Sequence, residues 1–242
     1  MEWPGRNKDA MEQDLEDPPT RTGEPSTLAH QIYSEMEACI LDGTWPPETK
    51  MSLRKLAKSL DTSMQPVREA VGRLVAASAL EMTRGRAIRV PRLTREQADE
   101  IWGLRLLLEG EAAARFAARN RPDEARRLYR HTRELREHFR AREINATMRA
   151  IMSWNADLTE GAGSPILKEM VMRLRLRYAP FITETLSVDM PDDQEFLQFT
   201  LHIQDELVLA IEEGDSAAAR HLRCSDLRSF QRYLYTRRGW DR

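Results

Sequence analysis

Apolar residues from residue 94 almost to the C-terminus recur every three or four positions, and this spacing constrains the fold more than any other feature of the sequence. Such spacing places an apolar stripe on one side of an amphipathic helix. Six stretches of this kind, joined by short connections, predict an antiparallel all-α bundle over residues 93–237. The first of them has its stripe at Ile101, Leu104, Leu108, Ala112 and Phe116.

The preceding residues, 27–92, change period several times and predict a smaller domain of a different kind. Helical spacing runs through residues 28–40 and 53–60, and a third helix is expected from Ser63, which can cap it. Two short stretches, 81–83 and 87–90, then flank a basic tip and predict a hairpin. Three helices followed by a two-stranded wing describe a winged helix-turn-helix. The predicted fold is therefore mainly α, with this domain preceding the bundle.

Charge is distributed unevenly along a chain whose formal net charge is only −2. Residues 50–92 contain ten Lys or Arg and three Asp or Glu, a net charge of +7. A basic segment in an acidic protein indicates contact with a polyanion, although a solvated charged face would have the same composition. Residues 1–26 are acidic and lack an apolar period, so we expect a disordered tail there, and a short C-terminal tail over 238–242.

The predicted third helix and the wing carry residue types that read DNA. An α-helix fits the major groove, where Arg68 can donate two hydrogen bonds to guanine and Gln65 can pair with adenine. A glycine at the wing tip lets the backbone approach the sugar-phosphate closely, between two arginines. We therefore predict a DNA-binding surface made of Arg54, Ser63, Gln65, Arg68, Arg84, Gly85 and Arg86.

The same segment resembles the signature of the GntR family of bacterial transcription regulators. The resemblance covers roughly residues 28–91, and its most specific part is Pro66-Val-Arg-Glu-Ala70. It implies a homodimer that binds a short palindromic operator in double-stranded DNA. It also implies that Arg54, Arg68 and Gly85 occupy positions that contact DNA.

Three residues depart from the family pattern. Asp61 stands where glycine is usual, Met64 where a DNA-contacting arginine is usual, and Gln65 where threonine is common. We expect Met64 to extend the apolar stripe of its helix, and Asp61 to adopt the left-handed conformation that aspartate tolerates better than most residues. The loss of one cationic contact implies an operator that differs from the usual one.

Residues 94–236 resemble the FCD effector domain of the FadR subfamily, through Gly163-Ser-Pro165 and Glu206-Leu-Val-Leu-Ala-Ile-Glu-Glu-Gly-Asp215. Many FCD domains bind a divalent metal through an aspartate and three histidines. Loss of imidazole ligands removes most affinity for transition metals, so we predict no metal and no other cofactor. The matching positions in this sequence are Ile151, Asn155, Gln204 and Asp226.

Four polar residues lie on or near the apolar stripes of four different predicted helices: Arg105, Asn155, Gln204 and Asp226. Buried polar groups need partners, so these should meet one another, water or a ligand. One hypothesis is that Arg105 binds an anionic or carbonyl-bearing effector, which Asn155 and Gln204 orient. The alternative is a buried Arg105–Asp226 ion pair whose remaining hydrogen bonds the amides fill. The arginines at positions 173, 175 and 177 alternate across their helix, so at most part of this run can face inward, and it is interpreted mainly as solvated surface.

The sequence argues against catalysis and against membrane insertion. It contains no phosphate-binding loop, nucleophile elbow or metal triad, and its five histidines are scattered. Its two cysteines suggest no disulfide framework, which fits a reducing cytoplasm. No apolar run is long enough to cross a bilayer, and the N-terminus lacks a secretory signal.

The resulting prediction is a cytoplasmic, sequence-specific DNA-binding regulator, a repressor, whose operator affinity is modulated by a small metabolite bound in the bundle. Two alternatives stay open. One is a regulator without a small-molecule effector, and the other is a helical module that binds protein.

Overall fold

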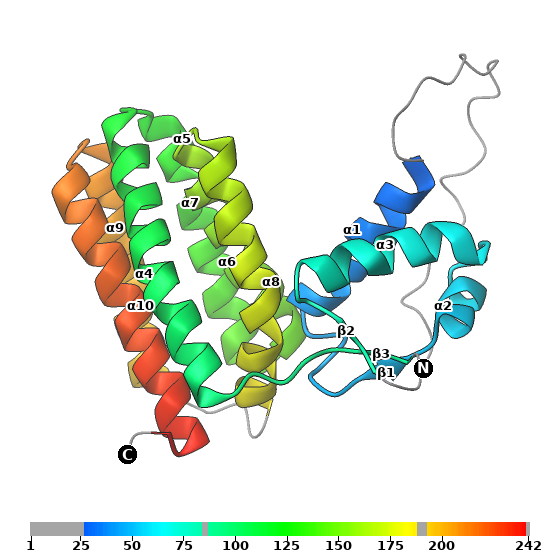
Figure 1. Cartoon of the computed structure of the whole chain (residues 1–242). Helices are drawn as coiled ribbons and strands as arrows, with labels where there is room; N and C mark the ends of the chain where they lie inside the picture. The colour runs from blue at the N-terminus through cyan, green and yellow to red at the C-terminus, as the bar shows by residue number, and fades with distance from the viewer. Residues whose placement is uncertain (1–26, 84–86, 188–192, 241–242) are drawn as a thin grey trace, which may run out of the picture.

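The computed structural model describes residues 27–83, 87–187 and 193–240, and it places them in two domains (Figure 1). The predicted tail 1–26 and the predicted wing tip, Arg84-Gly85-Arg86, lie outside the described residues. Within those residues the N-terminal domain consists of three helices and three short strands. Their bounds are α1 (Thr27–Leu41), β1 (Lys50–Met51), α2 (Leu53–Ser59), α3 (Met64–Ala76), β2 (Glu81–Met82) and β3 (Ile88–Arg89).

The core of the N-terminal domain forms where α1 packs against α3. The apolar stripe of α3, which includes Val67, Val71 and Leu74, is buried in one cluster with residues of α1 and of the sheet. The turn from α2 into α3 passes through Asp61 at a φ of +47°, the left-handed conformation that the sequence predicted. This turn fixes the angle at which α3 leaves α2.

The sheet contains one strand more than the predicted two-stranded wing. Its order is β1-β3-β2, with both neighbours of β3 antiparallel to it. The added strand, β1, comes from the loop after α1, a two-residue element too short for a periodicity to reveal. The side chain of Arg89 on β3 joins three segments of the sheet region. It forms an ion pair with Glu81 of β2, and its Nη1 lies 2.9 Å from Oε2 of Glu48, in the loop before β1.

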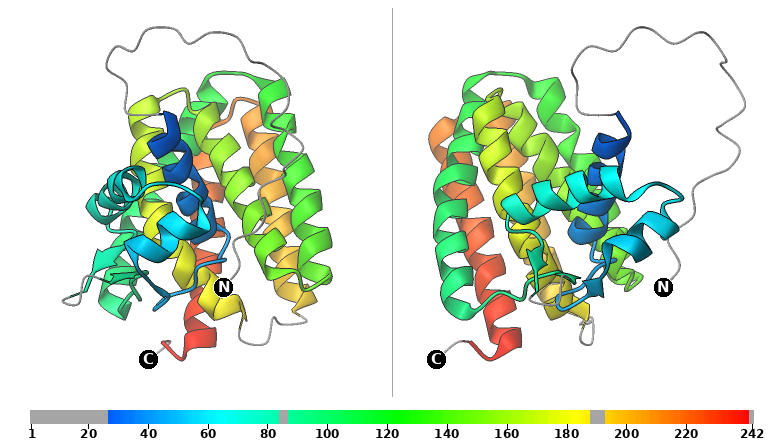
Figure 2. Two further views of the ribbon diagram at one scale, coloured as in Figure 1. Left: turned by 90° about the vertical axis from the view of Figure 1, so that its right-hand side faces the viewer. Right: turned by 45° about the vertical axis from the view of Figure 1, so that its right-hand side comes forward.

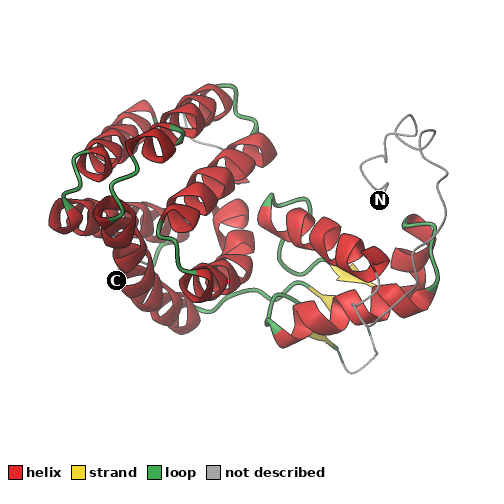
Figure 3. Cartoon of the chain, turned by 90° about the horizontal axis from the view of Figure 1, so that it is seen from above, coloured by secondary structure: helices red, strands yellow, loops and turns green. Residues whose placement is uncertain are grey.

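The C-terminal domain is the predicted helical bundle (Figure 3). All six predicted helices are present, and the second is divided at Arg127 into a short and a longer helix. In the described ranges the bundle helices are α4 (Arg95–Ala118), α5 (Pro122–Arg126), α6 (Leu128–Arg140), α7 (Ile144–Gly161), α8 (Pro165–Ser187), α9 (Gln194–Glu212) and α10 (Ser216–Arg238).

The middle of α4 is rotated from the stripe that the sequence predicted. Leu104, assigned to the buried stripe, is 47% exposed, whereas Trp102, Arg105 and Glu109 are buried. The rotation is possible because the arginine and the glutamate neutralise each other inside the bundle. The middle of the buried side of α4 is therefore polar, with Glu109 buried beside the Arg105 that the sequence had already placed there.

Helix α8 of the bundle makes contacts with the N-terminal domain. It packs against α1, as both views of Figure 2 show, and its Leu176 belongs to the hydrophobic core of the N-terminal domain. Thr183 of α8 lies directly against Gly43, whose φ of +82° and lack of a side chain permit this approach. Glu184, next along the helix, accepts a hydrogen bond of 2.6 Å from Arg92 in the interdomain segment. A displacement of α8 would therefore change its contacts with the N-terminal domain and so the position of that domain.

No helix within residues 27–83, 87–187 and 193–240 is both long enough and apolar enough to span a membrane.

Candidate functional site

The first candidate site is the exposed side of α2 and α3. Arg54, Ser63, Gln65 and Arg68 are all exposed, while the opposite side of α3 is buried. Gln65 and Arg68 are three residues apart and therefore share one side of the helix. Figure 1 shows α2 at the end of the N-terminal domain that lies farthest from the bundle, with the start of α3 beside it. The bundle thus leaves this side of the domain open.

Two residues at the start of α3 behave differently from expectation. Met64 does not extend the apolar stripe, because as the first residue of the helix it is 38% exposed. Ser63 precedes the helix in an extended conformation, but its side chain makes no hydrogen bond to the backbone N–H groups of the first turn. Ser63 is exposed, so its hydroxyl is not used in capping the helix.

In the predicted wing, the described residues on both sides of 84–86 are hydrogen-bonded to each other. Thr83 donates a backbone hydrogen bond of 2.8 Å to the carbonyl oxygen of Ala87, which extends the pairing of β2 with β3. The proposed contacts of Arg84, Gly85 and Arg86 lie outside the described residues and stay predictions.

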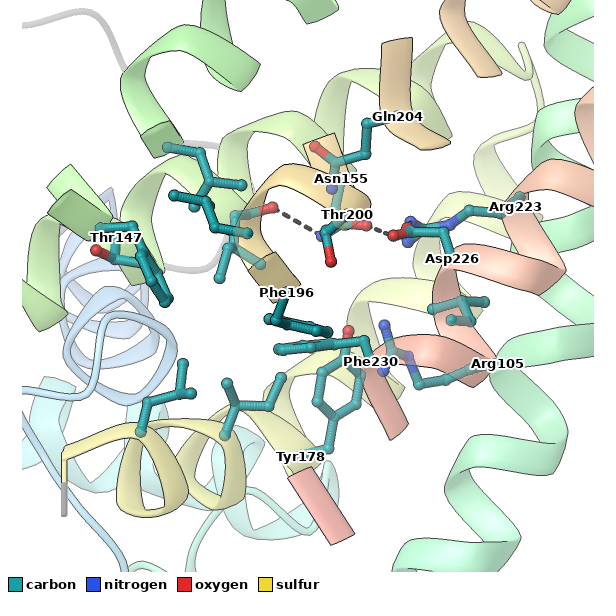
Figure 4. A pocket seen from close by; sticks show the side chains of 17 residues that line it. Arg105, Thr147, Asn155, Tyr178, Phe196, Thr200, Gln204, Arg223, Asp226 and Phe230 are labelled. Atoms are coloured by element: carbon teal, nitrogen blue, oxygen red, sulfur yellow. Dashed lines mark hydrogen bonds and ion pairs between the residues drawn. The ribbon is translucent and has the colours of Figure 1, made fainter. Parts of the chain in front are cut away.

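The second candidate site is a cavity inside the bundle (Figure 4). It has a volume of about 50 Å³, which exceeds the roughly 10–15 Å³ that one buried water requires. All four residues predicted to form an effector pocket line it, each from a different helix: Arg105 from α4, Asn155 from α7, Gln204 from α9 and Asp226 from α10. All four are buried.

A buried network of ion pairs forms one wall of this cavity. Arg105 Nε donates to Glu109 Oε1 at 2.7 Å, and the other oxygen of Glu109 accepts from Arg175 at 3.1 Å and from Arg223. Arg223 also donates to Asp226 at 2.6 Å and to the side-chain oxygen of Asn155. The alternative of an Arg105–Asp226 ion pair is therefore wrong, since each of these residues has a different partner.

The charges of this network do not cancel. Three guanidinium groups, those of Arg105, Arg175 and Arg223, face two carboxylates, which leaves one positive charge in excess. Burial alone would raise the pKa of Glu109, but the three arginines together hold it below its ordinary value. Burial raises the pKa of Asp226 against the opposing effect of Arg223, and burial with the neighbouring cations lowers the pKa of Arg175. The cluster therefore favours an additional negative charge.

Arg105 is held in place while part of its guanidinium stays available. Its central carbon lies 4.0 Å from the ring centre of Trp102 and 3.8 Å from that of Tyr178, so the guanidinium stacks against two aromatic faces. Among the described residues, its Nη1 atom has no hydrogen-bond partner, and neither do the Tyr178 hydroxyl and the Gln204 side-chain oxygen. All three residues line the cavity.

Comparisons with known families match both domains. The profile of bacterial regulatory proteins, gntR family, matches residues 28–90, and the profile of the FCD domain matches residues 100–228, more than half of the chain. This protein belongs to the GntR family and carries an FCD domain. Members of this family are transcription regulators and not enzymes.

Relatives agree with this assignment to the GntR family. The HTH-type transcriptional regulator McbR of Escherichia coli (strain K12) is 27% identical over 199 residues, which cover 81% of this chain and 87% of McbR. An uncharacterized HTH-type transcriptional regulator of Bacillus subtilis (strain 168), YdhC, is 31% identical over 85 residues, 35% of this chain and 38% of YdhC.

Solved structures confirm the predicted fold. E. coli McbR/YncC superposes with a TM-score of 0.80 at 23% identity, covering 88% of this chain and all of that one. A transcriptional regulator GntR from Rhodococcus sp. RHA1 superposes with a TM-score of 0.70 at 19% identity, covering 90% of this chain and all of that one.

The FCD domain of this GntR protein does not fit the metal that many FCD domains bind. Of the four matching positions, Ile151 offers no ligand atom in its side chain, and Asp226 is paired with Arg223. The Asn155 amide nitrogen donates to the backbone of Ile151 at 2.7 Å, and its oxygen accepts from Arg223. Over the described ranges, no group of three or more His, Cys, Asp or Glu side chains could hold a metal ion.

Sequence reasoning missed three charged members of the ion-pair network beside the cavity, of which Arg223 alone lines it: Glu109, Arg175 and Arg223. Of the arginines at 173, 175 and 177, Arg173 is exposed and Arg175 is fully buried, so the part of the run that faces inward is Arg175. A signal was present for each of the three in the spacing of the helices. Glu109 follows Arg105 by four residues, Arg175 follows Val171 by four, and Arg223 follows Ala219 by four.

Proposed function

We propose that this GntR protein is a cytoplasmic repressor that binds a palindromic DNA operator as a homodimer, and that a small anionic metabolite bound in the FCD domain changes its affinity for the operator. The observation that carries the DNA-binding part is the open side of α2 and α3, where the four described DNA-contact candidates are exposed together. A dimer seated on an operator that overlaps a promoter excludes RNA polymerase, which is the physical basis of repression.

The roles of the exposed residues follow from their positions on α3 and α2. Gln65 and Arg68 lie in the first turns of α3, the part of a recognition helix that reaches base edges in the major groove. Arg68 would read a guanine and Gln65 an adenine. Arg54 on α2 and Ser63 before α3 would contact phosphates, with the wing residues Arg84, Gly85 and Arg86 doing so on the adjacent groove.

The route from effector to operator runs through α8. Tyr178, Ile182 and Leu186 of this helix line the cavity, and Leu176 and Thr183 on the same helix contact the N-terminal domain. An effector that prefers one position of α8 would shift the population of N-terminal domain orientations. The change in operator affinity cannot exceed the difference in effector affinity between the two states.

An exposed apolar face supports the homodimer. Leu104 and Leu107 on α4, with Ile166 and Met170 on α8, are between 47% and 73% exposed. We call these four residues the α4–α8 face. They lie around a contact in which Leu108 of α4 packs beside residues of α8. Large apolar side chains exposed on two adjacent helices favour an interaction surface, and a second copy of this chain would cover it.

Leu107→Asp is therefore expected to prevent dimerisation, because it places a charge in the centre of a buried interface. Size-exclusion chromatography with light scattering should give the mass of one 28.0 kDa chain for the variant and twice that mass for the unmodified protein. Leu209→Asp, at a 43% exposed leucine on α9, is the matched control and should stay dimeric. A Leu107→Asp variant that remains a dimer would remove the α4–α8 face from the proposal.

Gel shifts test the DNA-binding part of the proposal. The full chain is titrated against the DNA upstream of its own gene, and against the same DNA with its palindromes scrambled, at several salt concentrations. Specific binding with about 6–10 phosphate contacts should weaken by roughly 10³–10⁵ between about 50 and 200 mM salt, because each contact releases counterions. A protein-interaction module would give equal, weak shifts with both DNAs, and that result would reject the proposal.

A further inference from the structure

The pocket contains a positive charge of its own, the guanidinium of Arg223, close to the positions that hold a metal ion in many FCD domains. The FCD positions that would hold a metal fall on four residues, and Arg223 contacts two of them, Asn155 and Asp226, through its guanidinium. We propose that the guanidinium of Arg223 takes the place of the metal ion, and that with Arg105 it binds small organic acids that have one carboxylate and an apolar body, without any metal. This inference rests on the proposed effector site and names its ligand class.

The charge of the ligand follows from the charge of the pocket wall. Three guanidinium groups face two carboxylates, so one positive charge is buried without a counterion in the cluster. An unbalanced buried charge is costly, and a single negative charge on a ligand would neutralise it. A ligand with two negative charges would leave the opposite excess. The site therefore favours monoanions over both dianions and neutral molecules.

The hydrogen-bonding groups at the polar end match a carboxylate. Arg105 Nη1 and the Tyr178 hydroxyl are donors that lack partners in the described structure, and both residues line the cavity. A carboxylate has two oxygens and can accept from both donors at once. Arg105 is held between two aromatic rings and by Glu109, so it is already oriented for this contact.

The opposite end of the cavity is mainly apolar, and the Thr147 hydroxyl is a polar group there that has no partner among the described residues. Leu135, Phe139 and Leu197 line it and belong to one hydrophobic cluster, which contains no member of the ion-pair network. Figure 4 shows Arg105, Arg223 and Asp226 on one side of the cavity and Thr147 on the other. A ligand that spans this space needs a charged head and an apolar tail. The volume of about 50 Å³ favours a short tail of a few carbons.

Calorimetric titration of the full chain, after treatment with a chelator and dialysis, tests the inference. Butyrate, succinate and butyramide share a four-carbon length and differ in charge, and acetate and hexanoate extend the series. We expect butyrate to bind at least about tenfold more tightly than succinate or butyramide, since the charge-assisted contacts need one carboxylate. Lengthening the chain from acetate should add about fourfold per buried methylene. Added Mn²⁺ or Zn²⁺ should leave these affinities unchanged.

Two variants locate the binding. Arg105→Met and Arg223→Met each leave two guanidinium groups facing two carboxylates, so neither creates a new charge imbalance, and each should weaken butyrate binding at least about tenfold. Arg130→Met, at an exposed arginine on α6, is the control and should bind like the unmodified protein. Circular dichroism checks that each variant is folded, and the ligand series on the unmodified protein does not depend on any variant.

Several results would overturn the inference: butyrate binding that appears only with added metal, succinate bound as tightly as butyrate, no binding of any monocarboxylate in the series, or unchanged binding to folded Arg105→Met. These binding results and the gel-shift results test different proposals and can be told apart. A protein that still shifts its operator specifically but fails these titrations loses only the ligand class. A protein that binds butyrate but shows no specific operator shift loses the DNA-binding function.

Discussion

Glu109→Gln is expected to destabilise the protein by about 3–5 kcal/mol, because it leaves three buried guanidinium groups facing a single carboxylate. Glu109 is 1% exposed and pairs with Arg105, Arg175 and Arg223, so no solvent is available to compensate its loss. For a chain of this length, each kcal/mol lowers the Tm by roughly 2–4 °C. Thermal and urea denaturation followed by circular dichroism at pH 7 should therefore show a fall in Tm of about 10 °C.

Glu111→Gln is the matched control for this substitution. Glu111 lies two residues further along α4 and also pairs with two arginines, Arg115 and Arg220, but its side chain is 34% exposed. Exposed ion pairs contribute about 0–1 kcal/mol, so the control should denature close to the unmodified protein. Equal losses for the two variants would mean that burial of the network does not determine its contribution.

A double variant separates charge imbalance from lost packing. Arg105→Met combined with Glu109→Gln restores the original excess of one positive charge, with two guanidinium groups facing Asp226. We expect it to be more stable than Glu109→Gln alone, a coupling that a double-mutant cycle measures directly. If the double variant is less stable than both single variants, the loss of stability in Glu109→Gln comes from lost packing and not from charge imbalance.

The domain organisation was predictable because it rests on periodicity, which many residues share. A helical spacing sustained over a whole segment survives the misplacement of any single residue, so the bundle and the three N-terminal helices were recovered. The stripe of α4 was misplaced in its middle for the opposite reason. Leu104 is apolar and Glu109 is charged, and the usual burial preference assigns the first to the core and the second to solvent.

That preference fails where charged residues neutralise one another across helices. Arg105, Arg175 and Arg223 come from α4, α8 and α10, and they are buried because all three contact Glu109 or lie beside it. The four-residue spacing within α4 could have indicated the Arg105–Glu109 pair, but the pairing of Glu109 with Arg175 and Arg223 joins three helices and is not visible in the spacing of any one of them. Arg105, Asn155 and Asp226 could be placed in the pocket because each lies on an apolar stripe, and Gln204 because it lies at the edge of one.

The short elements were missed for a third reason. The strand β1 has two residues and the break between α5 and α6 is the single residue Arg127, so neither leaves a repeat for a pattern to detect. Both depend on tertiary contacts: β1 pairs with β3, and α5 packs against α9.

Arg68→Ala is expected to weaken specific operator binding by roughly 5–150-fold, because a bidentate arginine–guanine contact contributes about 1–3 kcal/mol of discrimination. Arg68 is exposed on α3 on the same side as Gln65, whereas the neighbouring Val67 is fully buried, so the substitution should leave the fold intact. Fluorescence anisotropy with a labelled operator would measure the affinity, and operators with each base pair changed in turn would locate the contact. The variant should lose its preference at one base pair in each half-site and keep it elsewhere.

Two further variants show whether Arg68 reads a base or only a phosphate. Arg54→Ala removes a cation from α2 that we assign to the backbone, so it should weaken binding to all operators equally and reduce the slope of log affinity against log salt by about one. Arg130→Ala, an exposed arginine on the far domain, should change neither quantity. If Arg68→Ala behaves like Arg54→Ala, with a uniform loss and no base pair singled out, then α3 does not enter the major groove at Arg68. Sequence recognition would then have to reside in Gln65 or in the wing.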